Sequence, residues 1–186
     1  MAKSRFSKED WLLLGLDLLK SDGPAGLTVE KVCAKADKTR GSFYHHFEDH
    51  SAFLSGLADY WRDRYNLELF DHLNKAEPGM RQLETINDLA SLLDLRLEVE
   101  IRKLAEKETD IAQIVSDMDR RRLDYLEQAY QLIAHSLPVN ARELAELDYT
   151  SFLGAILLWP NIPEAKQKHF AGILPRLIGL SLGKEM

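Results

Sequence analysis

The residues from Thr39 to His46 combine side chains that donate hydrogen bonds with an absence of carboxylates. On a helical wheel Phe43 and Phe47 point to one side, and Gly41 and His45 point most nearly to the other. The polar residues on the outward side and its edges are Thr39, Arg40, Ser42, Tyr44, His45 and His46. Phosphate oxygens and many base edges accept hydrogen bonds and repel carboxylates. The chemistry that these residues suit is therefore non-covalent recognition of double-stranded DNA.

The residues that would hold this surface in place lie just before it, in the stretch from Leu27 to Leu54. An apolar stripe over residues 29–36 predicts a short amphipathic helix, with Thr28 as its N-cap. Asp37 and Lys38 interrupt the stripe, and such a turn needs a residue that tolerates a left-handed backbone. Thr39 then caps a second short helix. Two short helices joined by a tight turn predict a helix-turn-helix.

This stretch resembles the head of the TetR (tetracycline-repressor-like) family of bacterial transcription regulators. The residues that match in order and spacing are Leu27, Thr28, Val29, Val32, Cys33, Thr39, Arg40, Gly41, Ser42, Phe43, Tyr44, His46 and Phe47. The resemblance implies an all-α fold, with a three-helix DNA-binding head in residues 1–50 and a helical dimerisation and ligand domain in residues 51–186. It further implies a ligand-released dimeric repressor that inserts helix 39–46 into the major groove of a palindromic operator.

Two positions depart from the family pattern and bear on the expected DNA contacts. Asp37-Lys38 stands where the family has Gly-Val, and His50 stands where it has a lysine. Lys38 is placed to reach a phosphate, whereas His50 is only partly charged at neutral pH. The expected DNA-binding residues are Thr28, Lys38, Thr39, Arg40, Gly41, Ser42, Tyr44, His45, His46 and His50.

The rest of the chain shows helical periodicity and no strand pattern. The expected helices cover residues 6–20, 50–74, 82–97, 98–107, 141–159 and 165–182, and a long apolar stripe covers 111–133; Pro175 would kink or interrupt the last helix. The last two helices are more apolar than the surface of a monomer requires. Their apolar residues could fill the monomer core, but the resemblance favours a homodimer through these helices.

A small-molecule effector of unknown identity is also implied by the resemblance. Aromatic and isolated charged residues line such pockets, and the candidates are Trp61, Tyr65, Arg96, Tyr125, Tyr149 and Trp159. Core packing or surface ion pairing is the alternative for each of them. The run Asp119-Arg120-Arg121-Arg122 is interpreted as a solvated helix face, and less readily as an anion site.

Charge and composition fit this organisation. The eight basic residues of positions 1–54 cancel the eight acidic ones, so the remainder carries the whole formal charge of −6. Acidic surface outside the head would help to restrict DNA contact to the head. No apolar run is long enough to span a bilayer, no signal peptide is evident, and the single Cys33 fits a reducing compartment as a buried apolar residue. We therefore expect a cytoplasmic protein with no membrane partner.

The sequence is also compatible with two other classes of function. A helical protein-interaction domain with a degenerate DNA-binding head is the main alternative. A helical enzyme is less favoured, because the sequence lacks the Glu-x-x-His pairs of di-iron bundles, a P-loop, a nucleophile elbow and a dinucleotide fingerprint. His45 and His46 diverge by about 100° on the wheel. We expect no metal site and no cofactor.

Overall fold

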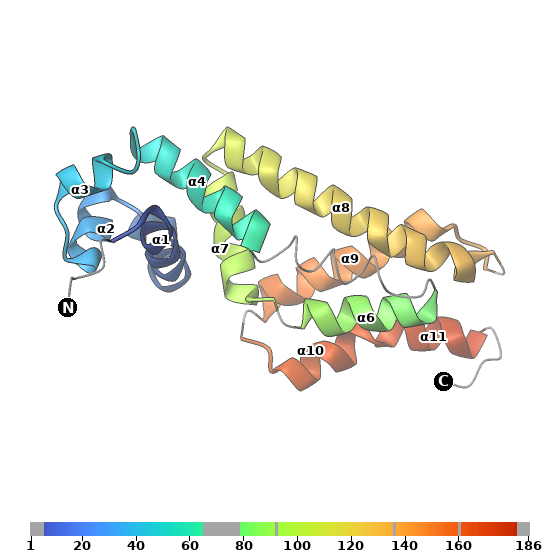
Figure 1. Ribbon diagram of the computed structural model, residues 1–186. Helices are drawn as coiled ribbons and strands as arrows, with labels where there is room; N and C mark the ends of the chain where they lie inside the picture. Colours follow the sequence, from blue (N-terminus) through green and yellow to red (C-terminus); the bar gives the residue numbers. More distant parts are fainter. Residues whose placement is uncertain (1–5, 65–78, 92, 136, 160, 182–186) are drawn as a thin grey trace. The chain divides into compact units, whose positions relative to one another are not determined.

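The computed structural model describes residues 6–64, 79–91, 93–135, 137–159 and 161–181. All regular structure within these ranges is helical, as expected (Figure 1). The helices are α1 (Lys8–Asp22), a 3-10 turn (Pro24–Gly26), α2 (Val29–Ala36), α3 (Arg40–Tyr44), α4 (His50–Arg62), α6 (Met80–Ala90), α7 (Leu95–Ala105), α8 (Thr109–Ala134), α9 (Ala141–Leu158), α10 (Glu164–Ala171) and α11 (Ile173–Ser181). No helix in the described ranges has the length and apolar character needed to cross a membrane.

The helices form two compact units. The first unit holds α1 to α4, nearly all of α7 and the start of α8. The second unit holds α6, the rest of α8, and α9 to α11. Each unit has a buried core of its own.

Aromatic rings form the core of the first unit. Trp11, Phe43 and Phe53 are fully buried, and Phe47 is 3% exposed. The Phe43 ring centroid lies 5.5 Å from that of Trp11 and 5.2 Å from that of Phe53. This burial confirms that Phe43 and Phe47 point inward. It also anchors α3 to this core, because Phe43 is the buried residue of that short helix.

Gly15 allows α1 and α4 to pack closely. A Cβ atom at Gly15 would lie 2.7 Å from both the Leu57 Cδ1 atom and the Phe53 Cζ atom. Real Cβ atoms do not approach other heavy atoms so closely, so a larger residue would force a shift in this core. α4 itself begins as predicted, since the Asp49 carboxylate accepts a hydrogen bond of 2.7 Å from the Ala52 amide. The expected continuation of this helix to residue 74 falls largely outside the described residues.

Two expected helices are each divided in the structure. The helix predicted over 82–97 ends at Ala90, and α7 begins at Leu95 after a turn closed by the Leu93 amide bonding to the Ala90 carbonyl. The boundary predicted between residues 97 and 98 is therefore wrong, because it lies inside α7. Asp94 stands just before α7, where carboxylates are favoured. The helix predicted over 165–182 is divided at Gly172. Pro175 lacks the amide that would bond to the Ala171 carbonyl, which explains the interruption.

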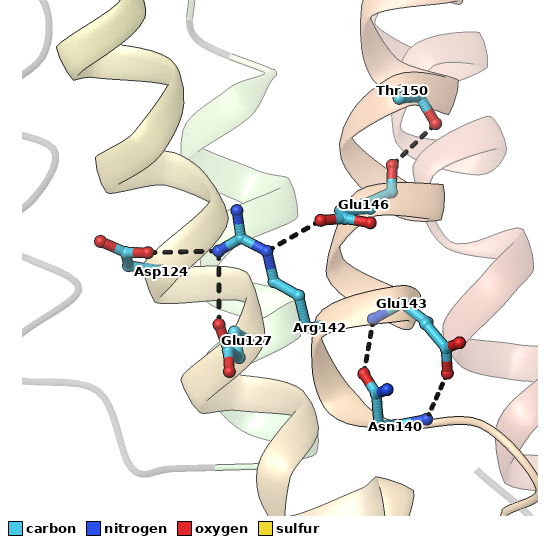
Figure 2. A network of polar contacts seen from close by, with 7 residues as sticks. All are labelled: Asp124, Glu127, Asn140, Arg142, Glu143, Glu146 and Thr150. Atoms are coloured by element: carbon cyan, nitrogen blue, oxygen red, sulfur yellow. Dashed lines mark hydrogen bonds and ion pairs between the residues drawn. The ribbon is translucent and has the colours of Figure 1, made fainter.

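Polar contacts position the start of α9 against α8, as Figure 2 shows. Asn140 and Glu143 form a capping box, with hydrogen bonds of 2.8 and 2.9 Å. The Arg142 guanidinium donates to Glu146 on its own helix, at 3.0 Å, and to two carboxylates of α8. The latter are Asp124 and Glu127, each at 3.3 Å. One exposed ion pair contributes little, but this network joins two helices.

The core of the second unit draws on four helices. Its buried residues are Leu83 of α6; Leu126, Ala129, Tyr130, Ile133 and Ala134 of α8; Leu144, Ala145 and Tyr149 of α9; and Ile178 of α11. α10 contacts both α6 and α9. The apolar stripe predicted in the long helix therefore faces a core, as expected. Apolar side chains also lie exposed on this unit, among them Leu132 of α8, Leu157 and Leu158 of α9, and Leu177 and Leu180 of α11.

Candidate nucleic-acid interface and ligand cavity

The turn between α2 and α3 depends on Asp37. Its backbone is left-handed, with φ 52° and ψ 48°, and it is the one non-glycine residue with positive φ among those described. The Asp37 amide bonds to the Ala34 carbonyl at 3.3 Å, and the Lys38 amide bonds to the Cys33 carbonyl at 3.0 Å. These bonds end α2 and redirect the chain. The expectation of a left-handed residue in this turn is confirmed.

Both predicted threonine caps are confirmed. The Thr28 Oγ1 atom accepts from the Lys31 amide at 3.4 Å, and the Thr39 Oγ1 atom accepts from the Ser42 amide at 3.2 Å. A hydroxyl that accepts in this way keeps its own proton to donate outward. The helix after Thr39 is shorter than the expected 39–46, and it ends at Tyr44.

The outer face of α3 is open to solvent. Tyr44 is 43% exposed, and Arg40, Gly41 and His45 are exposed as well. Ser42 and His46, at the edges of this face, are half-buried. A Cβ atom at Gly41 would meet only the Thr39 Oγ1 atom, at 3.8 Å. The described protein therefore leaves the space above Gly41 open.

Arg40 lies between an acidic and an aromatic neighbour. Its NH1 atom is 3.2 Å from the Glu30 Oε1 atom, and both side chains are more than half exposed. A hydrogen bond with the Tyr44 hydroxyl, followed by the charge of Glu30, raises the pKa of Arg40. Glu30 of α2 is thus a carboxylate in direct contact with an expected DNA-binding residue, a relation that the helical wheel of residues 39–46 does not include.

The two positions that depart from the family pattern have partners inside the first unit. The Lys38 Nζ atom lies 5.8 Å from the centroid of the Phe6 ring, a cation–π distance. The His50 Nε2 atom lies 2.7 Å from the Leu27 carbonyl oxygen. A carbonyl only accepts, so Nε2 carries the proton and ties the start of α4 to the residue before Thr28. A phosphate contact by either residue stays a prediction.

Cys33 is buried in the protein rather than exposed to solvent. It is 5% exposed, and burial raises the pKa of its thiol. Both facts agree with its interpretation as a buried apolar residue. Among the residues that the structure describes, no three His, Cys, Asp or Glu side chains come together to hold a metal ion.

The second unit contains a cavity of about 240 Å³. Its wall comes from α6, α8, α9, α10 and α11 and is mostly apolar. Tyr125 and Tyr149, two of the expected ligand residues, lie on this wall.

The other expected ligand residues lie elsewhere or outside the described chain. Trp61 is 1% exposed in the first unit, where the Arg96 NH2 atom also donates to the Ser21 carbonyl at 3.3 Å. Trp159 is 41% exposed, with its ring against that of Phe170. Tyr65 falls outside the described residues.

Two charged side chains, Asp148 and Arg122, also lie on the cavity wall, and Arg122 belongs to the run for which an anion site was the less favoured interpretation. Asp148 is 8% exposed and accepts a hydrogen bond of 2.9 Å from the Tyr130 hydroxyl. Burial raises the pKa of Asp148 to about 6, against the lowering effect of that hydrogen bond. Arg122 is 7% exposed and donates to the Tyr149 hydroxyl at 3.3 Å. The expectation that Asp119 to Arg122 form a solvated face is therefore wrong for Arg122.

Comparisons with known proteins place this architecture. No protein-family model and no curated protein sequence matches the chain. Solved structures do match. One is described as a transcriptional regulator of the TetR/AcrR family, with 23% identity, a TM-score of 0.69, and coverage of 95% of this chain and 96% of that one.

Two further structures match over similar lengths. The reduced form of NemR from E. coli gives 19% identity and a TM-score of 0.72, covering 91% of this chain and 95% of that one. AibR, in complex with isovaleryl coenzyme A and operator DNA, gives 16% identity and a TM-score of 0.70 over 93% and 96% of the two chains.

The chain has the TetR fold. The resemblance seen in the first third of the sequence thus extends to the architecture of nearly the whole chain. The TetR fold also accounts for the all-helical second unit, for which the sequence offered only apolar periodicity.

Asp148, which was not among the expected ligand residues, does leave a weak signal in the sequence. Asp148 follows Leu144 by four residues and precedes Phe152 by four, so it interrupts an apolar stripe of α9. A carboxylate in such a stripe indicates either an ion pair or a site.

Proposed function

We propose that this protein is a dimeric DNA-binding repressor that an effector releases from its operator. The observation that supports this most directly is α3. It is a short helix with an exposed, carboxylate-free face, anchored by Phe43 and held beside α2 by a left-handed turn. In a helix-turn-helix this second helix enters the major groove.

The proposed DNA contacts fall into two groups. Arg40, Gly41, Ser42, Tyr44 and His45 face the groove from α3 and its end. The contacts proposed for the flanking phosphates are Thr28, Lys38, Thr39, His46 and His50. Donors of this kind position a protein on the phosphate backbone, and the groove-facing side chains then read the bases.

Exposed leucines support the homodimer. Leu157 and Leu158 at the end of α9 are 63% and 70% exposed, and Leu177 and Leu180 of α11 are 58% and 70% exposed. Burial of such side chains against a second copy of the chain lowers the free energy. Two α3 helices on one palindromic site then bind far more tightly than one.

The cavity of the second unit is the proposed effector site. AibR, which has the same fold, was solved with isovaleryl coenzyme A and operator DNA together. An effector that binds better to the DNA-free form would shift the protein away from its operator. We place this protein in the cytoplasm, where it would meet both DNA and metabolites.

Binding to DNA from the protein's own genomic neighbourhood tests the proposal. The full-length protein is mixed with such fragments over a salt series, and bound fragments are footprinted. We expect a specific palindromic footprint with an affinity that falls steeply as salt rises. If the protein binds no fragment specifically at low salt, the repressor proposal is contradicted and the protein-interaction domain is favoured.

Tyr44→Ala tests the assignment of α3 itself. Loss of this exposed ring should abolish operator binding while the dimer stays intact by light scattering. Leu13→Ala is the matched control, because Leu13 is 40% exposed on α1 and is not a proposed contact. Unchanged operator binding by Tyr44→Ala would show that α3 is not the recognition helix.

A further inference from the structure

The cavity of the second unit is apolar apart from a few groups on its wall. Leucine, isoleucine and phenylalanine side chains such as Leu126, Phe152 and Ile156 form most of its surface. A cavity of roughly 150 Å³ accepts benzene, so a cavity of 240 Å³ admits a ring with a short polar extension. The charged groups on the wall then decide what that extension is.

Arg122, the basic group on this wall, belongs to a network that already contains a carboxylate. Its NH1 atom donates to the Tyr149 hydroxyl at 3.3 Å. The Tyr149 hydroxyl donates in turn to the Asp119 Oδ1 atom at 2.6 Å. The positive charge of Arg122 is therefore balanced through Tyr149 by a carboxylate three residues earlier on α8.

Asp148, the acidic group on the wall, has no such balance. Its Oδ2 atom accepts from the Tyr130 hydroxyl at 2.9 Å, and no basic side chain among the described residues pairs with it. A carboxylate offers about four acceptor positions, so one hydroxyl leaves most of them unused. A buried carboxylate is costly without a partner charge, and the cavity is where such a partner can enter.

We propose that the cavity binds a small hydrophobic organic cation, an amine or quaternary ammonium group on a one-ring body, with its charge against Asp148. Aromatic rings on the wall support the same class. Tyr149 and Phe152 lie stacked, with ring centroids 6.1 Å apart, and aromatic faces attract cations. The assignment of this cation as the effector rests on the proposed function, but its binding does not.

Calorimetric titration of the full-length protein tests the class of ligand. The probes are phenethylamine and benzyltrimethylammonium as cations, 2-phenylethanol as a neutral compound and phenylacetate as an anion. We expect both cations to bind more tightly than the alcohol, and phenylacetate to bind weakest. Tighter binding of phenylacetate, or no binding of either cation at millimolar concentration, overturns the proposal.

Asp148→Asn tests the residue. Asparagine keeps the shape and still accepts from Tyr130, so the cavity wall should survive. Removal of the charge should weaken phenethylamine binding by roughly ten- to a hundredfold and leave 2-phenylethanol nearly unchanged. Glu146→Gln is the matched control, since it removes a carboxylate from the same helix but outside the cavity. Equal binding of phenethylamine by Asp148→Asn and the unaltered protein overturns the assignment.

Operator release is measured separately, with the footprinted fragment. Cations that bind through Asp148 and release the fragment support both proposals. Cations that bind through Asp148 without releasing it leave the ligand class standing and contradict the effector role. The two proposals therefore fail in different experiments.

Discussion

Asp37 holds a backbone conformation that glycine adopts more easily. With φ at 52°, a β-carbon crowds the following carbonyl, and a side chain that lacks the short carboxylate of Asp is disfavoured further. We expect Asp37→Gly to be more stable than Asp37→Ala by about 1 kcal/mol in free energy of unfolding. Urea denaturation of the two variants measures the difference. Equal stabilities would mean that the turn is not left-handed in solution.

A substitution at Gly41 should affect folding stability and DNA binding in opposite directions. Among the residues that the structure describes, only the Thr39 hydroxyl approaches the place of its Cβ atom, so Gly41→Ala should raise helix stability by up to about 1 kcal/mol. If the DNA backbone occupies that space, the same methyl group should weaken operator binding by roughly tenfold or more. Thermal denaturation and fragment binding measure the two effects. A variant that binds DNA as well as the unaltered protein would show that α3 does not approach DNA at this position.

Residue-level prediction succeeded where the cause was local. Thr28 and Thr39 are caps because their side chains bond three residues ahead, a relation visible in sequence. The bond of His50 to Leu27 spans 23 residues and depends on how α4 meets α2. Asp148 likewise becomes a wall residue only when helices far apart in the sequence surround a cavity. Such relations come from packing rather than from spacing.

The packing of α1 against α4 is the sharpest constraint at the level of elements. A methyl group at Gly15 would press into Phe53, which is fully buried within the aromatic core. We expect Gly15→Ala to lower the free energy of unfolding by about 1–3 kcal/mol despite its better helix propensity. Guanidinium denaturation measures the change.

Gly56 provides the comparison for Gly15 on the facing helix. Its nearest neighbours would lie 3.6 and 3.8 Å from an added Cβ atom, which is ordinary contact. Gly56→Ala should therefore keep or raise stability, by up to about 1 kcal/mol. Similar losses in both variants would mean that helix packing at Gly15 is not as tight as described.

Helices were easier to predict than their ends. Apolar periodicity continued through residues 82–97, yet the chain turns between Ala90 and Leu95. The turn carries apolar residues as well as Ser91 and Asp94, so the stripe looked unbroken. The division of the last helix, by contrast, could be predicted from Pro175. Proline lacks the amide proton that would bond to the carbonyl four residues earlier, so the position of the missing hydrogen bond can be read from the sequence.

Assembly is the main expectation at the scale of the whole molecule. Leu158 and Leu177 carry the exposed apolar surface proposed for the dimer. Changing both to lysine should convert the dimer into a monomer and weaken operator binding, because the two α3 helices then bind independently. Light scattering measures the mass. Leu132→Lys, at a 59% exposed position of α8, should stay dimeric. A dimeric double variant would place the interface elsewhere.

Asp148 should make stability depend on pH. Its pKa rises from 3.8 to about 6 on folding, so the folded state holds the proton more firmly. The penalty for its charge is absent below pH 3.8, grows as pH rises through the interval and is complete above about pH 6. The other ionisable groups on the wall are Arg122, Tyr125 and Tyr149, types that do not ordinarily titrate in this range.

Asp148→Asn should remove that penalty. At pH 7 the variant should exceed the unaltered protein in free energy of unfolding by up to about 3 kcal/mol, and the difference should shrink toward pH 4. Denaturation at a series of pH values measures it. A constant difference across this range would mean that Asp148 titrates normally. A higher free energy of unfolding for the variant at pH 7 would show that the charge of Asp148 destabilises the folded protein. A cationic ligand could offset this destabilisation.

The three tryptophans give the chain a built-in optical readout. Trp11 and Trp61 are buried in the first unit, while Trp159 at the end of α9 is 41% exposed beside the proposed dimer surface. Indole emission shifts to the red in water, so the red edge of the spectrum belongs to Trp159 and the blue edge to the other two. Acrylamide quenching at the two edges then follows assembly and the state of the DNA-binding unit in one unlabelled sample.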